Sequence, residues 1–123
     1  MSDDSKRKIL IADDELSIRK LYEREFDRQG YAVIVASDGK ETLDKVREER
    51  PDLVILDVRM PGMDGVALAS RLKEEFPDVP VVALSGNLET KDGQDHNFVG
   101  FLEKPIRIEQ LQKMIEVALG QGD

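Results

Sequence analysis

The sequence contains no cysteine and only one histidine, His96. The absence of cysteine excludes disulfide bonds, thiolate catalysis and cysteine-based metal sites, and it fits a reducing compartment. No apolar run approaches the ~20 residues that are needed to span a membrane, and the polar first residues are unlike a signal peptide. We therefore expect a cytoplasmic protein without a membrane partner.

Basic side chains are also in deficit, with 18 Lys and Arg against 26 Asp and Glu and a formal net charge of −8. This balance would repel the phosphates of a nucleic acid, so we expect no nucleic-acid binding by this domain. The length of 123 residues suits a single domain. A hydrophobic content of 40% with 36% charged residues is typical of a globular chain rather than a disordered one.

Short apolar runs alternate with segments of helical periodicity, which predicts an α/β domain with a parallel sheet covered by helices on both faces. Residues 1–7 are expected to be a disordered tail, residues 8–120 the domain, and residues 121–123 a second tail. Residues 86–97 should hold the fourth helix, but they are polar, so a short or disordered helix is expected there. Strands are predicted at residues 8–12, 31–35, 53–56, 79–84 and 99–102, and the other helices at 16–28, 39–49, 64–76 and 106–119.

Polar side chains stand at the carboxyl ends of four predicted strands, namely Asp13 with Asp14, Asp57, Ser85 and Lys104. In an open parallel sheet these ends meet at one edge, where ligands bind. Three clustered carboxylates repel one another unless they take up protons or bind a cation. Carboxylates that are open to water suit a hard divalent ion such as Mg²⁺, which in turn suits phosphoryl transfer.

These side chains could divide the work of phosphoryl transfer. Asp57 can attack phosphorus and form an acyl phosphate, Lys104 can pair with a phosphoryl oxygen, and the Ser85 hydroxyl can donate a hydrogen bond to another oxygen. Each also has a structural interpretation: Asp14 could be a helix N-cap, Asp57 could form a turn, and Phe101 could be a core residue. The conjunction of four strand ends favours the phosphoryl-transfer interpretation.

Four stretches of the chain resemble the response-regulator receiver domain of two-component signalling, over about residues 8–119. The resemblance implies a flavodoxin-like (βα)5 three-layer sandwich, with a five-stranded parallel sheet of order 2-1-3-4-5. The strand order comes from the family and not from the residue pattern. The four stretches are ILIADDE (9–15), LDVRMPGMDG (56–65), ALSG (83–86) and FLEKP (101–105).

The resemblance also assigns roles at the strand ends. It implies that Asp57 is the phosphoacceptor and that Lys104 contacts the phosphoryl group. Asp14 and Asp57 would bind Mg²⁺ directly, Asp13 would bind it through water, and the backbone carbonyl of Arg59 would be a third protein ligand.

A further set of implied roles concerns conformational switching. The bond between Lys104 and Pro105 is expected to be cis. Ser85 matches the switch hydroxyl, and Phe101 matches the switch aromatic ring, whose rotamer follows Ser85. Phosphorylation would then bias a two-state equilibrium toward an active conformation.

The implied donor is a histidine kinase or a histidine phosphotransfer protein, and the implied downstream partner is an unknown target protein. A homodimer that depends on phosphorylation stays open as an alternative. The domain is expected to be a phosphoacceptor that promotes its own phosphotransfer and autodephosphorylation, and not an enzyme. Arg59, beside three carboxylates, is expected to form an ion pair, with Glu15 as the first candidate.

Three other functions fit less well. A phosphatase of the haloacid-dehalogenase type also uses an aspartate nucleophile and Mg²⁺, but it needs a second aspartate where this chain has Arg59. A flavodoxin-like cofactor binder needs a phosphate loop after the first strand, where Asp13 and Asp14 would repel a phosphate. A histidine phosphotransfer protein is disfavoured because His96 lies in a predicted loop.

Overall fold

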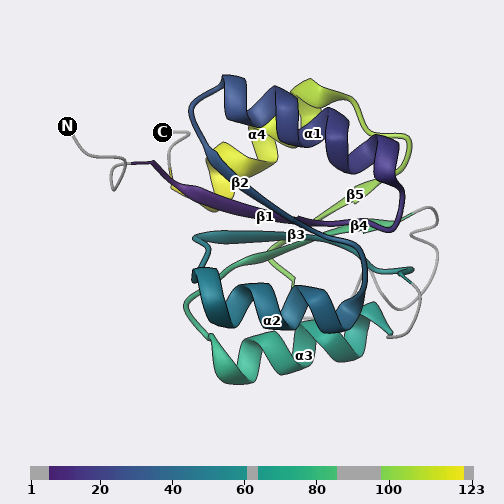
Figure 1. Cartoon of the computed structure of the whole chain (residues 1–123), viewed down its shortest axis with the longest axis vertical. Helices are drawn as coiled ribbons and strands as arrows, with labels where there is room; N and C mark the ends of the chain where they lie inside the picture. Colours follow the sequence, from purple (N-terminus) through teal and green to yellow (C-terminus); the bar gives the residue numbers. More distant parts are fainter. Residues whose placement is uncertain (1–5, 61–63, 86–97, 121–123) are drawn as a thin grey trace.

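A computed structural model of the chain describes residues 6–60, 64–85 and 98–120. Five strands and four helices lie in these ranges (Figure 1). The predicted fourth helix at 86–97 lies outside the described residues, and the predicted tails fall mostly outside them as well. In chain order the elements are β1 (Lys8–Ala12), α1 (Leu16–Arg28), β2 (Ala32–Ala36), α2 (Gly39–Glu49), β3 (Leu53–Asp57), α3 (Gly65–Glu75), β4 (Val81–Ser85), β5 (Gly100–Glu103) and α4 (Ile108–Ala118).

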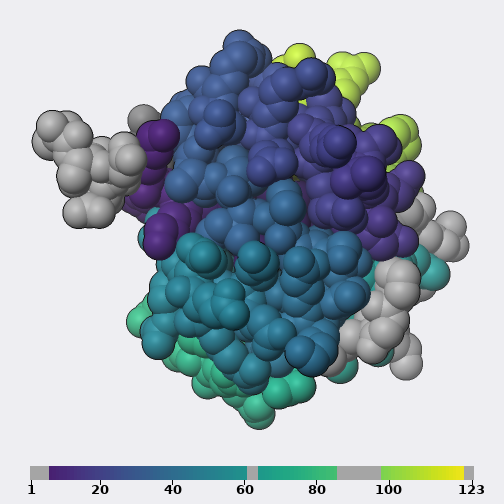
Figure 2. Space-filling view, in the orientation of Figure 1, coloured from purple at the N-terminus to yellow at the C-terminus, as the bar shows by residue number. Residues whose placement is uncertain are grey.

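The five strands form one parallel sheet in the order β2-β1-β3-β4-β5. Helices α1 and α4 cover one face of the sheet, and α2 and α3 cover the other (Figure 1). This arrangement confirms the predicted α/β sandwich and the strand order that the resemblance implied. The front of the molecule in Figure 2, coloured from purple to teal, is built mainly by the first half of the chain.

Each strand alternates its side chains between two buried cores, because successive residues of a strand point to opposite faces. On β1, Ile9 and Ile11 pack with α1 and α4, whereas Leu10 and Ala12 pack with α2 and α3. We call these two sides the α1/α4 face and the α2/α3 face. Burial on both sides explains why the central strands are apolar throughout.

Two aspartates begin helices on the α2/α3 face. The Asp38 carboxylate accepts a hydrogen bond from the Glu41 N–H (2.8 Å), and the Asp64 carboxylate accepts one from the Val66 N–H (2.9 Å). At Gly65 a Cβ atom would lie 2.4 Å from the Cα of Val58. Only glycine therefore lets the start of α3 approach the turn that follows β3.

Three strands begin later than the sequence predicted, namely β2, β4 and, by a single residue, β5, which starts at Gly100. The observed β2 starts at Ala32, because the Tyr31 N–H donates to the carbonyl of Phe26 at the end of α1 (3.0 Å) and is not available to the sheet. The observed β4 starts at Val81, because Pro80 has no N–H to give to the sheet, although its carbonyl accepts from the Val54 N–H (3.0 Å).

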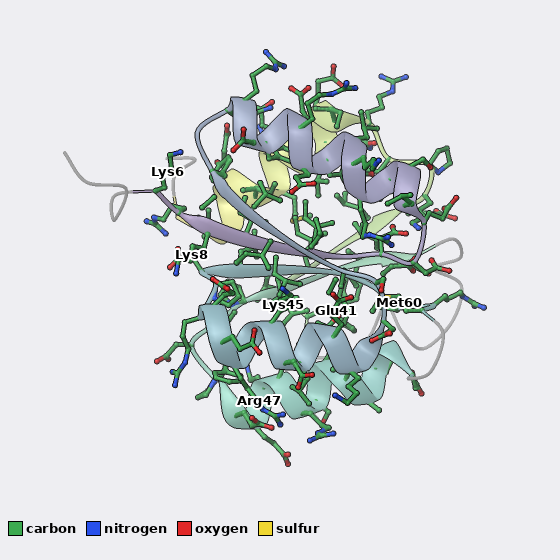
Figure 3. All side chains as sticks on the ribbon, in the orientation of Figure 1. Lys6, Lys8, Glu41, Lys45, Arg47 and Met60 are labelled. Carbon is green, nitrogen blue, oxygen red and sulfur yellow. The ribbon has the colours of Figure 1, made fainter. Side chains whose placement is uncertain are left out.

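The two ends of the sheet differ in what they carry. Lys8, at the start of β1, and Met60, just beyond β3, lie at opposite ends of the sheet (Figure 3). The polar strand ends described above therefore lie away from the first described residues. Within the described ranges, no helix has the length and apolar character needed to cross a membrane.

Candidate functional site

The backbone of the sheet holds the charged residues at the carboxyl ends of three strands. Asp57 is the last residue of β3, and Asp13 follows β1, with its N–H donating to the carbonyl of Ala36 (3.1 Å). Lys104 follows β5, and its N–H donates to the carbonyl of Ser85 (2.7 Å). The hydrogen bonds of the sheet thus continue past the strands, and they fix the backbone positions of Asp13 and Lys104.

The Lys104 ammonium bridges the two buried carboxylates. Its Nζ lies 3.1 Å from Oδ2 of Asp13 and 3.1 Å from Oδ2 of Asp57. Asp13 is completely buried and Asp57 is 4% exposed. Oxygen atoms of these two carboxylates and of the exposed Asp14 all lie within 4.8 Å of one another. The structure therefore brings together all four charged side chains that were predicted to form this site.

The second oxygen of each buried carboxylate is also held. Oδ1 of Asp13 accepts from the Glu15 N–H (2.9 Å), and Oδ1 of Asp57 accepts from the Arg59 N–H (3.0 Å). Arg19, on α1, donates to the backbone carbonyl of Asp13 (2.7 Å). Both side chains are thus oriented by their own loops.

The capping interpretation of Asp14 is wrong. The N-cap of α1 is Glu15, which makes no side-chain capping bond, and the carboxylate that accepts from the Glu15 N–H belongs to Asp13. Asp14 is instead an exposed carboxylate beside two buried ones. This position is suited to binding a cation rather than to stabilising the helix.

The electrostatic environment keeps Lys104 charged. Burial alone would lower the pKa of its ammonium, but the hydrogen bonds to Asp57 and Asp13 and the negative charge of both residues raise that pKa above its usual value. Tyr22, on α1, is 4% exposed. Burial raises the pKa of its phenol, the charge of Asp13 raises it further, and Lys104 counteracts this effect. Tyr22 therefore belongs to the electrostatic surroundings of the site, which sequence reasoning missed.

The donor set fits Mg²⁺. Asp13, Asp14 and Asp57 offer carboxylate oxygens, which are the ligands that this hard ion prefers, and Asp14 is open to solvent. The role of the Arg59 carbonyl in metal binding stays a prediction. The expected ion pair of Arg59 is wrong: its side chain is exposed and, among the residues that the structure describes, it has no ion-pair partner, Glu15 included.

The predicted switch residues lie on the other face of the sheet. Ser85, the last residue of β4, follows Val81 and Ala83, which pack on the α2/α3 face, so the strand alternation places Ser85 on that face as well. Ser85 is completely buried, and Phe101 on β5 is half-buried against the same core. Their roles as switch residues stay predictions.

Two further features lie close in sequence to Phe101, a cis peptide bond and a second phenylalanine ring. The peptide bond between Lys104 and Pro105 is cis. Phe98, just before β5, packs its ring against Phe101 at a centroid distance of 5.5 Å. Sequence reasoning did not single out Phe98, although the spacing of two phenylalanines three residues apart was visible in the sequence.

A cavity of about 380 Å³ opens next to Lys104, between α1 and the loop that follows β5. A larger hollow of about 620 Å³ lies along α1 and β2, but none of the charged site residues lines it. The smaller cavity is therefore the one that bears on the chemistry. Its lining residues are Glu15, Ile18, Leu21, Tyr22, Lys104, Pro105 and Ile106.

Several curated proteins are similar to this chain in sequence. Sporulation initiation phosphotransferase F of Bacillus subtilis is 36% identical over 112 residues, which cover 89% of this chain and 90% of that protein. Probable transcriptional regulator ycf27 of Guillardia theta is 36% identical over 119 residues, which cover 94% of this chain but 46% of that protein. The chain spans about half the length of most of the curated relatives that it matches.

Solved structures show the same similarity. Chemotaxis response regulator CheY4 of Vibrio cholerae superposes with a TM-score of 0.86 at 30% identity. The match covers 94% of this chain and 100% of that one. Response regulator TrrA of Thermotoga maritima, solved in complex with Mg²⁺-BeF, has a TM-score of 0.84 at 28% identity, over 92% of this chain and 99% of that one.

The family comparison agrees with the geometry. The model of the family "Response regulator receiver domain" matches residues 9–116, which include every charged residue of the site. Receiver domains are the parts of two-component response regulators that accept phosphoryl groups on an aspartate, and they interact with histidine kinases or phosphotransfer proteins. The chain therefore belongs to the response regulator receiver domain family.

Proposed function

We propose that this domain accepts a phosphoryl group on Asp57 from the phosphohistidine of a histidine kinase or a histidine phosphotransfer protein. The observation that carries the proposal is the bridge from Lys104 to Asp13 and Asp57, at 3.1 Å to each carboxylate, with Asp14 at the same edge of the sheet. A buried carboxylate, a permanent cation and a cluster of metal ligands are the parts that aspartyl phosphorylation needs.

In this proposal an oxygen of Asp57 attacks phosphorus and forms an acyl phosphate. The bond between phosphorus and the donor imidazole nitrogen breaks, and that nitrogen keeps the electron pair. Asp14, Asp57 and the Arg59 carbonyl would hold Mg²⁺ directly, and Asp13 would hold it through water; the ion would supply positive charge to the phosphoryl oxygens. Lys104 would pair with one of these oxygens, and the Ser85 hydroxyl would donate to another.

The cavity beside Lys104 supports the access that a donor would need. It opens at the same edge as the carboxylates, and Ile18, Leu21 and Pro105 give it an apolar wall. The domain itself would be a phosphoacceptor that promotes its own phosphorylation and dephosphorylation rather than an enzyme. A cytoplasmic setting is part of the same proposal, since a chain without cysteine suits a reducing compartment.

Labelling by acetyl phosphate with Mg²⁺ tests the assignment of Asp57. The parent protein should gain the mass of one phosphoryl group, and Asp57→Asn should gain none, because an amide is not a nucleophile for phosphorus. Asp27→Asn is the matched control, since Asp27 is exposed on α1. Labelling retained in Asp57→Asn, or lost in both variants, would contradict the assignment.

Phosphorylation would then move Phe101 and shift the domain to an active conformation that a target protein binds. A relay between two histidines is the second candidate, and it is favoured by the 90% coverage of sporulation initiation phosphotransferase F. Mixing the phosphorylated domain with a histidine phosphotransfer protein separates the two. Transfer of the label to histidine supports a relay, whereas simple decay of the acyl phosphate supports a switch.

A further inference from the structure

Two phenylalanine rings meet in an edge-to-face contact at the start of β5. The ring centroids of Phe98 and Phe101 lie 5.5 Å apart, with an angle of 65° between the ring planes. Phe98 is 7% exposed, and both rings pack on the α2/α3 face. Val99, between them, is 60% exposed, so the chain turns both rings inward and the intervening side chain outward.

Phe98 is the aromatic neighbour that Phe101 has in the described part of the chain. On the neighbouring strand β4, the residue paired with Phe101 is Ala83, whose methyl group offers little contact area. Ser85 lies two residues further along β4, on the same face of the sheet. Phe98 therefore constrains the orientation of the Phe101 ring, to which the paired residue Ala83 offers little contact.

We propose that Phe98 is a positioning residue for Phe101: the edge-to-face contact holds the Phe101 ring half-buried and resists its rotation when Asp57 is phosphorylated. The inference rests on the proposed function, in which the rotamer of Phe101 follows Ser85. A rotation of the ring away from Phe98 gives up the edge-to-face contact, which stabilises a pair beyond its buried area. The phosphorylated state must offset that loss.

Thermodynamic linkage turns this into a measurable affinity. If the contact opposes the active conformation, its removal makes that conformation easier to reach, and a ligand that selects it binds more tightly. Phe98→Leu keeps an apolar side chain in the core but removes the aromatic edge. With Mg²⁺ and beryllofluoride as a phosphoryl mimic, we expect about a three- to tenfold lower Kd for Phe98→Leu than for the parent protein.

Phe76→Leu is the matched control. Phe76 is half-buried against the same core, but its ring lies under the guanidinium of Arg50 at 5.5 Å and, among the described residues, makes no ring contact with Phe101. Both substitutions should lower the melting temperature, because both remove aromatic contacts from one core. Only Phe98→Leu should change the Kd for beryllofluoride, and a purely structural role for Phe98 would leave that Kd unchanged.

A double-mutant cycle with Phe101→Leu completes the test. In the Phe101→Leu background, Phe98→Leu should no longer change the Kd, because the ring that it positions is gone. A Kd of Phe98→Leu equal to or above that of the parent would overturn the inference, as would equal tightening in Phe76→Leu or in the Phe101→Leu background. A parent protein that binds no beryllofluoride would reject the proposed function and the inference together, whereas parent binding with an unchanged Phe98→Leu rejects the inference alone.

Discussion

The α1/α4 face and the α2/α3 face contribute different kinds of side chain to the same edge of the sheet. On the first, Asp13, Asp57 and Lys104 are already joined by direct hydrogen bonds. On the second, Ser85 and Phe101 are placed by burial and by contact between rings. One half of the site is thus fixed by charge and the other by packing.

The alternation of a single strand accounts for this division. Phe101 packs with the α2/α3 core and Leu102 with the α1/α4 core, so Lys104, two residues further on, falls on the side of Leu102. The end of β5 therefore serves both halves of the site at once. In the proposed switch, a change of charge on the α1/α4 face moves a ring on the α2/α3 face, and each prediction below alters one of the two faces.

Removal of the Lys104 charge should have the largest effect. Lys104→Met leaves the buried Asp13 and Asp57 carboxylates without their cation. We expect the free energy of unfolding at pH 7 to fall by about 2–3 kcal/mol, somewhat below the cost of breaking a fully buried pair, because Lys104 is partly exposed. Urea unfolding with and without Mg²⁺ measures this loss, and Mg²⁺ should restore part of it.

Lys113→Met is the control for this substitution, since Lys113 is exposed on α4 and should not affect stability measurably. Equal stability of Lys104→Met and the parent would mean that the bridge from Lys104 to the two carboxylates does not stabilise the folded state.

The second prediction separates the effect on metal binding from the effect on stability at the carboxylates of the α1/α4 face. Asp14→Ala should weaken Mg²⁺ binding by about tenfold or more, yet leave the melting temperature unchanged or higher, because repulsion among the carboxylates is relieved. Asp13→Ala should lower the melting temperature, because Asp13 holds both Lys104 and the Glu15 N–H. Calorimetric titration and thermal unfolding measure the two effects, and a lower melting temperature of Asp14→Ala would contradict the prediction that this side chain serves metal binding alone.

The third prediction concerns Ser85 on the α2/α3 face. Ser85→Ala should leave the Mg²⁺ affinity unchanged, because Ser85 lies on the opposite face from the lysine–carboxylate bridge. It should lower stability by about 1 kcal/mol and abolish the response of the Phe101 ring resonances to beryllofluoride in NMR spectra. A ring response that persists without the hydroxyl would show that the two faces communicate by another route.

The smallest effect should come from the ion pair between α2 and α3. Arg47, labelled in Figure 3, donates to both carboxylate oxygens of Glu75 (3.1 and 2.8 Å). The hydrogen bond from Arg47 lowers the pKa of Glu75. A lowered pKa means that the stabilisation is present above the usual pKa of a glutamate and is lost as the pH falls through the folded-state value.

Glu75→Gln should therefore melt slightly below the parent at neutral pH, and the difference should vanish on acidification. Glu74→Gln, at an exposed neighbouring position, is the control. Thermal unfolding across the acidic range measures the difference, and the Mg²⁺ affinity should stay constant throughout. A gap that widens toward low pH would contradict the direction of the pKa shift.

Helical periodicity and the charged residues at strand ends were enough to predict the lysine–carboxylate site on the α1/α4 face. The expected helix at 16–28 matches α1 (Leu16–Arg28), and the expected strand at 8–12 matches β1 (Lys8–Ala12). The clustering of Asp13, Asp57 and Lys104 followed from one rule, that the carboxyl ends of parallel strands share an edge. Charged side chains at such ends have few structural reasons to be there, which makes them conspicuous in a sequence.

Local detail was harder to predict, because it depends on which of several equivalent groups makes a bond. Asp13 and Asp14 are both placed to cap α1, and only the three-dimensional path of the loop gives the Glu15 N–H to Asp13. Arg59 had carboxylates nearby, yet its side chain points to solvent. Phe98 was missed for a different reason: its spacing from Phe101 was visible in the sequence, but only the path of the chain into β5 decides whether the two rings meet.

The environment of Tyr22 has a practical consequence for optical spectroscopy. The chain has no tryptophan and two tyrosines, so its near-ultraviolet emission comes from Tyr22 and Tyr31 alone. Both rings flank Phe26, but only Tyr22 experiences the charges of Asp13 and Lys104, while Tyr31 experiences those of Glu116 and Arg7. The protein thus carries its own unlabelled fluorophore at the acidic site, with an internal reference at the far side of the same phenylalanine.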